Sequence, residues 1–226
     1  MTGVQTCALP IFTFDIGGVI FSDEAFKRAI FQALIQLSPG ITQSEFDEIY
    51  WQHLKNPDGS LRNKLTKYFL KDLNRKQELM KIANNLWRFE AEDLYQDAKS
   101  TLSAVKKQGL KIGAVANQPA TVVDDLKREQ IFNYFDALAI SALEGVEKPD
   151  SKLFQIAIDR LQIPADQIVH VGNRIDTDVV PAKSLGMKTI WVRRGEANPN
   201  PSADDIKLAD LVVSDLLKIP ELIKQI

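Results

Sequence analysis

The chain of 226 residues has a single cysteine, Cys7, and only two histidines, His53 and His170. A lone cysteine cannot form an internal disulfide, which favours a reducing compartment such as the cytoplasm. The histidines have no further ligand at the spacing of a zinc site, so we expect both to be packing or surface residues. The chain is therefore not expected to depend on disulfides or on structural zinc.

The sequence also lacks long apolar runs and an excess of basic residues. No apolar stretch approaches the roughly 20 residues that a membrane-spanning helix needs. The N-terminus lacks the basic segment and apolar core of a secretory signal. The net charge is -2, and lysine and arginine are scattered along the sequence rather than clustered. We therefore expect a cytoplasmic protein that binds neither a membrane nor a nucleic acid.

Residues 1–11, MTGVQTCALPI, look like the in-frame translation of a sequencing adapter. We therefore set this segment apart as an artefact and assign it no function. The alternative is a natural N-terminal arm. On the first interpretation, the fold is expected to begin at Phe12.

Short apolar segments alternate with amphipathic segments along most of the chain, which predicts a parallel sheet covered by helices. Apolar runs bounded by turn residues are typical of strands that are buried on both faces. We therefore expect an α/β fold with a doubly wound, Rossmann-like parallel sheet. The predicted strands are 12–21, 110–116, 137–140, 168–171, 189–192 and, at an edge, 211–213.

Residues 22–96 break this alternation because they read as helices throughout. Thr42 and Glu45 match a capping box, which predicts a helix that starts there. An insertion of this size after the first strand is expected to form a small helical domain at the carboxyl ends of the strands, where open α/β sheets bind ligands. The core domain would comprise residues 12–21 and 97–226, and the insertion would be a cap. The other helices predicted in the insertion are 25–37, 61–73 and 75–89.

Asp15 lies in the first predicted strand and is followed by Gly17 and Gly18. A carboxylate at the end of a strand, beside exposed N–H groups, can act as a nucleophile next to an anion site. The alternative is an ordinary turn, since aspartate and glycine are common turn residues.

The ends of the second and third strands carry Asn117 and Lys148. The amide of Asn117 could orient a phosphate, or it could cap the next helix, which Pro119 would open at its first position. Lys148 could neutralise the charge of a phosphoryl group. Alternatively, it is a solvated loop residue.

After the fourth strand come Asn173 and Asp178, whose side-chain oxygens suit Mg²⁺. Asp178 could also cap the next helix. In the insertion, Arg62, Lys64 and Lys67 could meet an anionic substrate or form a solvated helix face.

Taken together and in this order, the four loops resemble the motifs of the haloacid dehalogenase superfamily from Phe12 to the C-terminus. The resemblance is carried by Asp15, by Lys148 within the phrase VEKPD, and by Asp178 with the run 179–187 that follows it. It implies that Asp15 is the catalytic nucleophile, that Lys148 is the catalytic lysine, and that the insertion is a cap of type C1.

The resemblance also implies a ligand set. Mg²⁺ would be held by Asp15, the main-chain carbonyl of Gly17, Asn173 and Asp178, and the phosphate by Gly17, Gly18 and Asn117. The substrate would be a small phosphorylated molecule.

Three positions depart from the family pattern. Gly17 stands where phosphatases of the family carry a second aspartate, Ala116 where they carry serine or threonine, and Asn173 where they carry aspartate. The missing aspartate would protonate the leaving oxygen, and acid–base groups of this kind typically supply about 10²–10⁴-fold in rate. Asp176 and Glu144 are candidates to replace it.

The expected function is Mg²⁺-dependent hydrolysis of a small phosphorylated metabolite through an aspartyl-phosphate intermediate, favouring activated phosphates, which need the missing acid least. The first alternative is a non-catalytic domain that binds a ligand or a protein. A 2-haloacid dehalogenase is less favoured, because Ala116 replaces a serine that those enzymes use and the spacing of the fourth loop does not match theirs.

Overall fold

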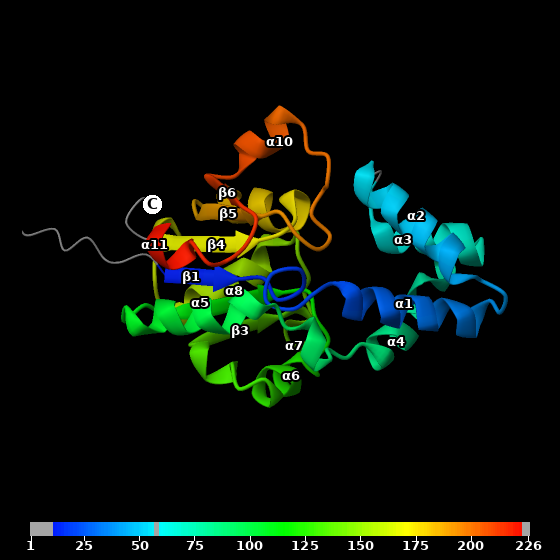
Figure 1. Ribbon diagram of the computed structural model, residues 1–226, viewed down its shortest axis with the longest axis horizontal. Coiled ribbons are helices and arrows are strands. Elements are labelled where there is room, and N and C mark those ends of the chain that lie inside the picture. The colour runs from blue at the N-terminus through cyan, green and yellow to red at the C-terminus, as the bar shows by residue number, and fades with distance from the viewer. Residues whose placement is uncertain (1–10, 57–58, 223–226) are drawn as a thin grey trace, which may run out of the picture.

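The core of the molecule is a parallel sheet of six strands in the order β3-β2-β1-β4-β5-β6, whose arrows point to the right in Figure 1. The computed structural model describes residues 11–56 and 59–222. The strand order reverses between β1 and β4, and a ligand crevice is expected outside the carboxyl ends at such a point. The predicted doubly wound sheet is confirmed. The strands are β1 (Ile11–Phe14), β2 (Ile112–Ala116), β3 (Ala137–Ile140), β4 (Ile168–Gly172), β5 (Lys188–Val192) and β6 (Leu211–Val213).

The first strand differs most from its prediction. It begins at Ile11, whose Cα pairs with Ile168, so Ile11 is part of the sheet although we had set it apart; residues 1–10 lie outside the described part of the chain. The strand ends at Phe14 rather than at Phe21. The apolar residues beyond Phe14 form a buried turn, in which the main-chain N–H groups of Ile20 and Phe21 donate to the carbonyl of Ile16.

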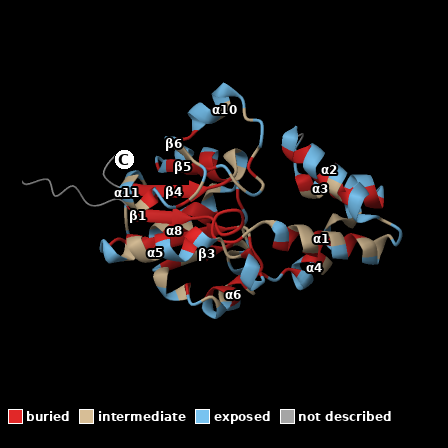
Figure 2. Cartoon of the chain, viewed as in Figure 1, coloured by how far each residue is buried: buried red, intermediate tan, exposed pale blue. Residues whose placement is uncertain are grey.

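Alternate residues of the strands pack on opposite faces of the sheet, as side chains of a strand do. On β2, Ile112 and Ala114 belong to one apolar cluster together with the helix α5, whereas Val115 belongs to a second cluster together with α8. Figure 2 shows the strands as the most continuously buried part of the molecule. The helices and short helical turns around the sheet are α5 (Gln96–Lys107), α6 (Val122–Arg128), η4 (Phe132–Tyr134), α7 (Ser141–Glu144), α8 (Ser151–Leu161), η5 (Ala165–Gln167), η6 (Ile175–Val179), α9 (Val180–Ser184), α10 (Ala203–Leu208) and α11 (Ile219–Leu222).

The helices between β1 and α5 form a cap beyond the carboxyl ends of the strands (Figure 1). Here α1 packs against α4, and α2 packs against α3. The hydroxyl of Thr42 accepts a hydrogen bond from the N–H of Glu45, which is the threonine half of the predicted capping box. The domain boundaries near residues 22 and 96 stay a prediction. The cap elements are α1 (Glu24–Leu37), α2 (Gln43–Lys55), α3 (Leu61–Leu65), η1 (Thr66–Leu70), η2 (Leu73–Arg75), α4 (Lys76–Leu86) and η3 (Ala91–Asp93).

Two cap helices are shorter than predicted. The predicted helix 61–73 changes from α-helical to π-helical geometry at Thr66 and ends at Lys71, which has a left-handed φ of 57°. The predicted helix 75–89 ends at Leu86, because Trp87 turns to extended geometry. Throughout the described residues, no helix combines the length and the apolar character that crossing a membrane requires.

Candidate active site

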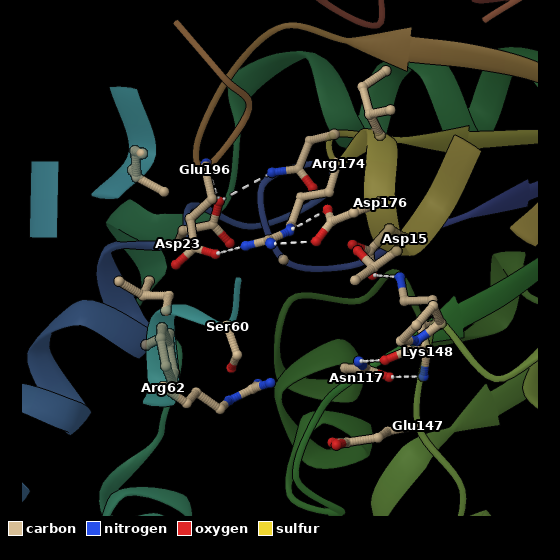
Figure 3. A pocket seen from close by; sticks show the side chains of 18 of the residues that line it. Asp15, Asp23, Ser60, Arg62, Asn117, Glu147, Lys148, Arg174, Asp176 and Glu196 are labelled. Atoms are coloured by element: carbon tan, nitrogen blue, oxygen red, sulfur yellow. Dashed lines mark hydrogen bonds and ion pairs between the residues drawn. The ribbon is translucent and has the colours of Figure 1, made fainter. Parts of the chain in front are cut away.

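A pocket of about 680 Å³ lies between the cap and the carboxyl ends of the strands (Figure 3). The sequence predicted that the loops after strands one to four would meet, because the carboxyl ends of parallel strands share one edge of the sheet. All four loops contribute to this pocket, and so does the cap. The core side includes Asp15, Gly17, Asn117, Lys148 and Asn173, and the cap side includes His53, Arg62 and Trp87.

Asp15 directly follows β1 and is only 8% exposed. Its Oδ1 accepts a hydrogen bond from the N–H of Ile16 at 2.7 Å and pairs with Nζ of Lys148 at 2.9 Å. Burial raises the pKa of Asp15 to about 7, and the positive charge of Lys148 opposes this rise. Because Oδ1 is occupied by these two partners, Oδ2 is the oxygen left for chemistry.

Lys148 lies buried between two carboxylates. Its Nζ is 2.9 Å from Asp15 Oδ1 and 2.5 Å from Asp178 Oδ1. Burial alone would lower the pKa of Lys148, but the two carboxylates outweigh burial and raise the pKa. For Asp178, burial opposes ionisation, but the charge of Lys148 and the neighbouring His170, whose Nε2 lies 3.8 Å from Asp178 Oδ1, lower the pKa below its usual value. Lys148 is therefore a charged residue at neutral pH and not a solvated loop residue.

Asn117 positions the loop of Lys148. Its Nδ2 donates to the Lys148 carbonyl at 2.9 Å, and its Oδ1 accepts from the Lys148 N–H at 2.7 Å. We expected this amide to orient a phosphate. In the structure its oxygen and one of its amide hydrogens hold the main chain of Lys148, which leaves one hydrogen for an anion.

Gly18 has a structural role that the phosphate prediction overlooked. Its φ is +67°, and a Cβ at this position would lie 1.9 Å from Nδ2 of Asn173. Its N–H donates to the carbonyl of Phe21 at 2.7 Å. Gly17, in contrast, lines the pocket. Gly18 therefore permits the tight turn and the close approach of Asn173, and its phosphate role stays a prediction.

The predicted metal ligands differ in how available they are. Asp178 is fully buried, and both of its oxygens have partners, with Oδ1 bound by Lys148 and Oδ2 by the N–H of Arg174 at 2.9 Å. Asn173 donates through Nδ2 to Asp23 and to the carbonyl of Arg194, which turns its Oδ1 to the other side. Within the described residues, no three His, Cys, Asp or Glu side chains gather as a metal cluster.

The donor set that remains is the carboxylate of Asp15, the Gly17 carbonyl and Asn173 Oδ1. Three oxygens suit Mg²⁺, which usually keeps several waters and takes only one or two carboxylates from the protein. The set fits Mg²⁺, but it carries one formal negative charge, so its affinity is expected to be low.

Sequence reasoning missed Asp23, which lies beside Gly17. A Cβ at Gly17 would be 3.0 Å from Asp23 Oδ1 and 2.9 Å from Gln118 Nε2. The carboxyl of Asp23 thus lies at the place where a side chain of residue 17 would begin. Asp23 Oδ2 accepts from the N–H of Glu196 at 2.7 Å and from Asn173 at 3.1 Å. Burial raises the pKa of Asp23 well above its usual range, and the nearby charge of Glu196 adds to this.

The sequence signal for Asp23 was weak because an aspartate before a helix reads as an N-cap. Asp23 does hold the N-cap position of α1, but its side chain makes no capping hydrogen bond. Three glycines from two loops make room for it, because Cβ atoms at Gly18 and Gly195 would lie 2.5 Å and 2.2 Å from its Oδ2.

The two acids that we expected as replacements lie elsewhere or are engaged. Glu144 pairs with Arg160 at 2.6 Å and is not among the lining residues of the pocket. Asp176 lines the pocket, but its side chain is 63% exposed and pairs with Arg174 at 2.8 Å.

Arg174 also connects the core with the cap. Its Nη1 is 3.1 Å from Oε2 of Glu196, and Oε1 of Glu196 accepts a hydrogen bond of 2.5 Å from the hydroxyl of Tyr50 in α2. Figure 3 shows Arg174, Glu196 and Asp23 together at one end of the pocket.

Known proteins resemble this chain in sequence and in fold. Glyceraldehyde 3-phosphate phosphatase of Pyrococcus furiosus is 29% identical over 129 residues, which cover 57% of this chain and 53% of that protein. Phosphoserine phosphatase of Thermus thermophilus is 30% identical, with 52% and 48% covered. The chain thus spans about half the length of the curated relatives it matches.

Among solved structures, the hydrolase YfnB of Bacillus subtilis, described with bound magnesium and with interdomain movement, shares the fold. Its TM-score is 0.68 at 17% identity, and the match covers 96% of this chain and 99% of YfnB. The sequence model of haloacid dehalogenase-like hydrolases matches residues 9–186, and the chain belongs to this family.

Proposed function

We propose that the protein hydrolyses the phosphate ester of a small molecule, with Asp15 as the nucleophile. The observation that carries this proposal is the arrangement of Asp15 and Lys148. A nucleophilic carboxylate needs one free oxygen and a nearby positive charge, and here Oδ1 is held by Lys148 and Ile16 while Oδ2 is left for attack. The relatives named above are phosphatases, which supports the same reaction type.

In the first half of the reaction, Oδ2 of Asp15 attacks phosphorus, the bond to the leaving oxygen breaks, and an aspartyl phosphate forms. In the second half, water attacks this phosphorus, inorganic phosphate leaves, and the carboxylate of Asp15 is restored. Lys148 offsets the negative charge that grows on the phosphoryl oxygens. The remaining amide hydrogen of Asn117 would bind one of them.

Mg²⁺ held by Asp15, the Gly17 carbonyl and Asn173 would supply positive charge, which keeps the nucleophile ionised and neutralises the phosphoryl group. The proposed role of Asp178 is to position Lys148 rather than to bind the metal, since both oxygens of Asp178 already have partners.

We further propose that Asp23 takes over the role of the acid missing at Gly17. Its carboxyl lines the pocket and lies next to the place where a side chain of residue 17 would start. It would donate a proton to the leaving oxygen in the first half of the reaction and take one from water in the second. With this group present, the substrate need not be an activated phosphate.

The experiment is an assay of wild-type protein against alkyl, aryl and acyl phosphates, with Mg²⁺ or with a chelator. We expect Mg²⁺-dependent release of phosphate. Thermal stability with Mg²⁺ and aluminium fluoride gives a second readout, because a mimic of the phosphoryl group should raise Tm. Absence of turnover and of this shift would favour the non-catalytic binding domain. Halide release from a 2-haloacid without metal would identify a dehalogenase instead.

The Asp23→Asn variant should lose activity in a way that depends on the leaving group. Asparagine keeps the shape and the acceptor oxygen for Glu196 but cannot supply a proton. For an alkyl phosphate we expect the single-turnover rate of alcohol release to fall by about 10²–10⁴-fold. For p-nitrophenyl phosphate, whose leaving group needs no proton, we expect a much smaller loss in the first half of the reaction. The measurement is single-turnover kinetics on both esters.

The matched control is Asp176→Asn, which also removes a carboxylate from the pocket lining. It should affect both esters equally and weakly. An equal loss on both esters in Asp23→Asn would contradict the proposed proton transfer.

A further inference from the structure

The pocket differs in charge between its two sides. The core wall carries the cations Lys148 and Arg174, both paired with carboxylates, and further acids such as Glu147. The cap contributes the cations Arg62 and Lys76. Among the residues that the structure describes, neither cation has an ion-pair partner. Arg62 extends from the cap into the space between cap and core in Figure 3. Of the three basic residues singled out in the sequence, Arg62 lines the pocket, and Lys64 and Lys67 do not.

The guanidinium of Arg62 packs against an aromatic side chain of the cap. Its guanidinium lies 5.3 Å from the centre of the Phe26 ring in α1, a cation–π contact. The Nε atom is buried and has no hydrogen-bond partner within the described residues. An arginine that is held in place and still has an unused donor is preorganised for an anion, since the planar group binds carboxylate and phosphate through paired hydrogen bonds.

Two further polar groups beside Arg62 are buried and unpartnered. Trp87 and Gln118 are each 5% exposed, yet Nε1 of Trp87 and Oε1 of Gln118 make no hydrogen bond to the described part of the chain. Both residues line the pocket. A buried donor or acceptor without a partner costs about 1–3 kcal/mol. The combination points to a ligand that supplies the missing partners.

The space around Arg62 continues beyond the catalytic loops. A second pocket of about 460 Å³ adjoins the first, and Arg62, Lys76, Trp87 and Gln118 line both. A ligand whose phosphoryl group lies at Asp15 could therefore extend past these residues.

We propose that the site is specific for phosphate esters that carry a second anionic group, a carboxylate or a second phosphate, and that Arg62 with Lys76 binds this group. The inference rests on the proposed function, because it places the reacting phosphoryl group at Asp15. The cap thereby selects doubly anionic substrates, while the acidic groups of the core wall disfavour a second anion elsewhere in the pocket.

The test compares three ligands with the same three-carbon chain. Propanediol bisphosphate and the phosphate ester of hydroxypropanoate carry a second anion, and propyl phosphate does not. Wild-type protein should prefer one or both of the first two in kcat/KM. The Arg62→Met variant should lose about 10- to 100-fold for the preferred ligand, as expected for a charged hydrogen bond, and change little for propyl phosphate. The two ligands with a second anion distinguish phosphate from carboxylate.

The control is Arg75→Met, which removes another cap arginine, one that pairs with Glu78 and does not line the pocket. It should leave all three ligands unaffected. Equal loss for the three ligands in Arg62→Met, or no preference in wild-type protein, would overturn the proposal.

Binding to the Asp15→Asn variant separates this proposal from the proposed function. Calorimetry on this variant measures Kd for the same three ligands without turnover. Suppose that the wild-type protein hydrolyses none of the ligands, but that Asp15→Asn binds the doubly anionic ligands more tightly than propyl phosphate. If Arg62→Met then removes this binding preference, the subsite is supported and the phosphatase activity is rejected. Hydrolysis of all three ligands with no preference among them would support the phosphatase activity and reject the subsite.

Discussion

Replacement of Asp15 by asparagine is expected to reduce phosphate release to the background rate. The amide has the shape of the carboxylate but cannot form an acyl phosphate, so the covalent step is lost. Removal of a nucleophile typically lowers kcat by a factor on the order of 10⁴ or more. The measurement is kcat on the best substrate of the ester panel, with acid quenching to detect phosphate bound covalently to the wild-type protein.

The fold of this variant should remain intact. Burial disfavours the ionised form of Asp15 and raises its pKa to about 7, so a neutral side chain is well accommodated there. Lys148 also keeps its contact with Asp178. Circular dichroism and Tm should therefore match the wild type. Activity within tenfold of wild type in a folded Asp15→Asn protein would exclude Asp15 as the nucleophile.

Replacement of Lys148 by methionine is expected to destabilise the protein strongly and to remove its activity. Methionine has a similar length, but it leaves Asp15 and Asp178 buried without the cation between them. Breaking a buried ion pair by removing one partner typically costs about 3–5 kcal/mol. For a chain of this size, this corresponds to a fall in Tm on the order of 10 °C. Urea unfolding at pH 7.5 measures the free energy directly.

The stability lost when methionine replaces Lys148 should become smaller as the pH falls. In the wild type, the folded-state pKa of Asp178 lies below its unfolded value, mainly because Lys148 outweighs the effect of burial. This stabilisation is present above the unfolded pKa and is lost as the pH falls through the folded pKa. Without Lys148, the largest effect opposing burial is gone and the pKa of both carboxylates rises, so the variant gains stability on acidification. The difference between the two proteins is thus largest near neutral pH.

The matched control is Lys106→Met, which removes the partner of Asp136 in a half-exposed pair with N–O distances of 2.8 and 2.9 Å. Pairs of this kind are worth about 0–1 kcal/mol. A similar loss in both variants would show that Lys148 contributes only as an ordinary surface cation does.

Strand positions followed well from the sequence because most strands are short apolar runs bounded by turns. The predicted strands 137–140 and 211–213 agree with β3 and β6 residue for residue. The first strand was predicted too long, since Ile16 and residues 19–21 are as apolar as a strand and fully buried in the turn. Hydrophobicity reports burial, and it does not distinguish a buried turn from a strand.

The sequence predicted the site residues whose position depends on the order of the strands. It did not predict the contacts that depend on how loops and side chains pack. Asp15, Lys148 and Asn173 each follow a strand of one parallel sheet, which is enough to bring them together. Asn117 was placed correctly, but its bonds to the main chain of Lys148 depend on the shape of a loop. Asp23 could not be found, because its placement depends on glycines in two loops that are far apart in the sequence.

The glycines around Asp23 make positions 17 and 23 an epistatic pair. An aspartate introduced at Gly17 would begin 3.0 Å from Oδ1 of Asp23 and would have to displace it. One arrangement has the acid at position 23 and glycine at position 17, and the other has the acid at position 17. A chain in which only one of the two positions has changed carries either two competing carboxyls or none. A chain of this fold can thus move an acid along its sequence while the acid hardly moves in space, provided that both positions change together.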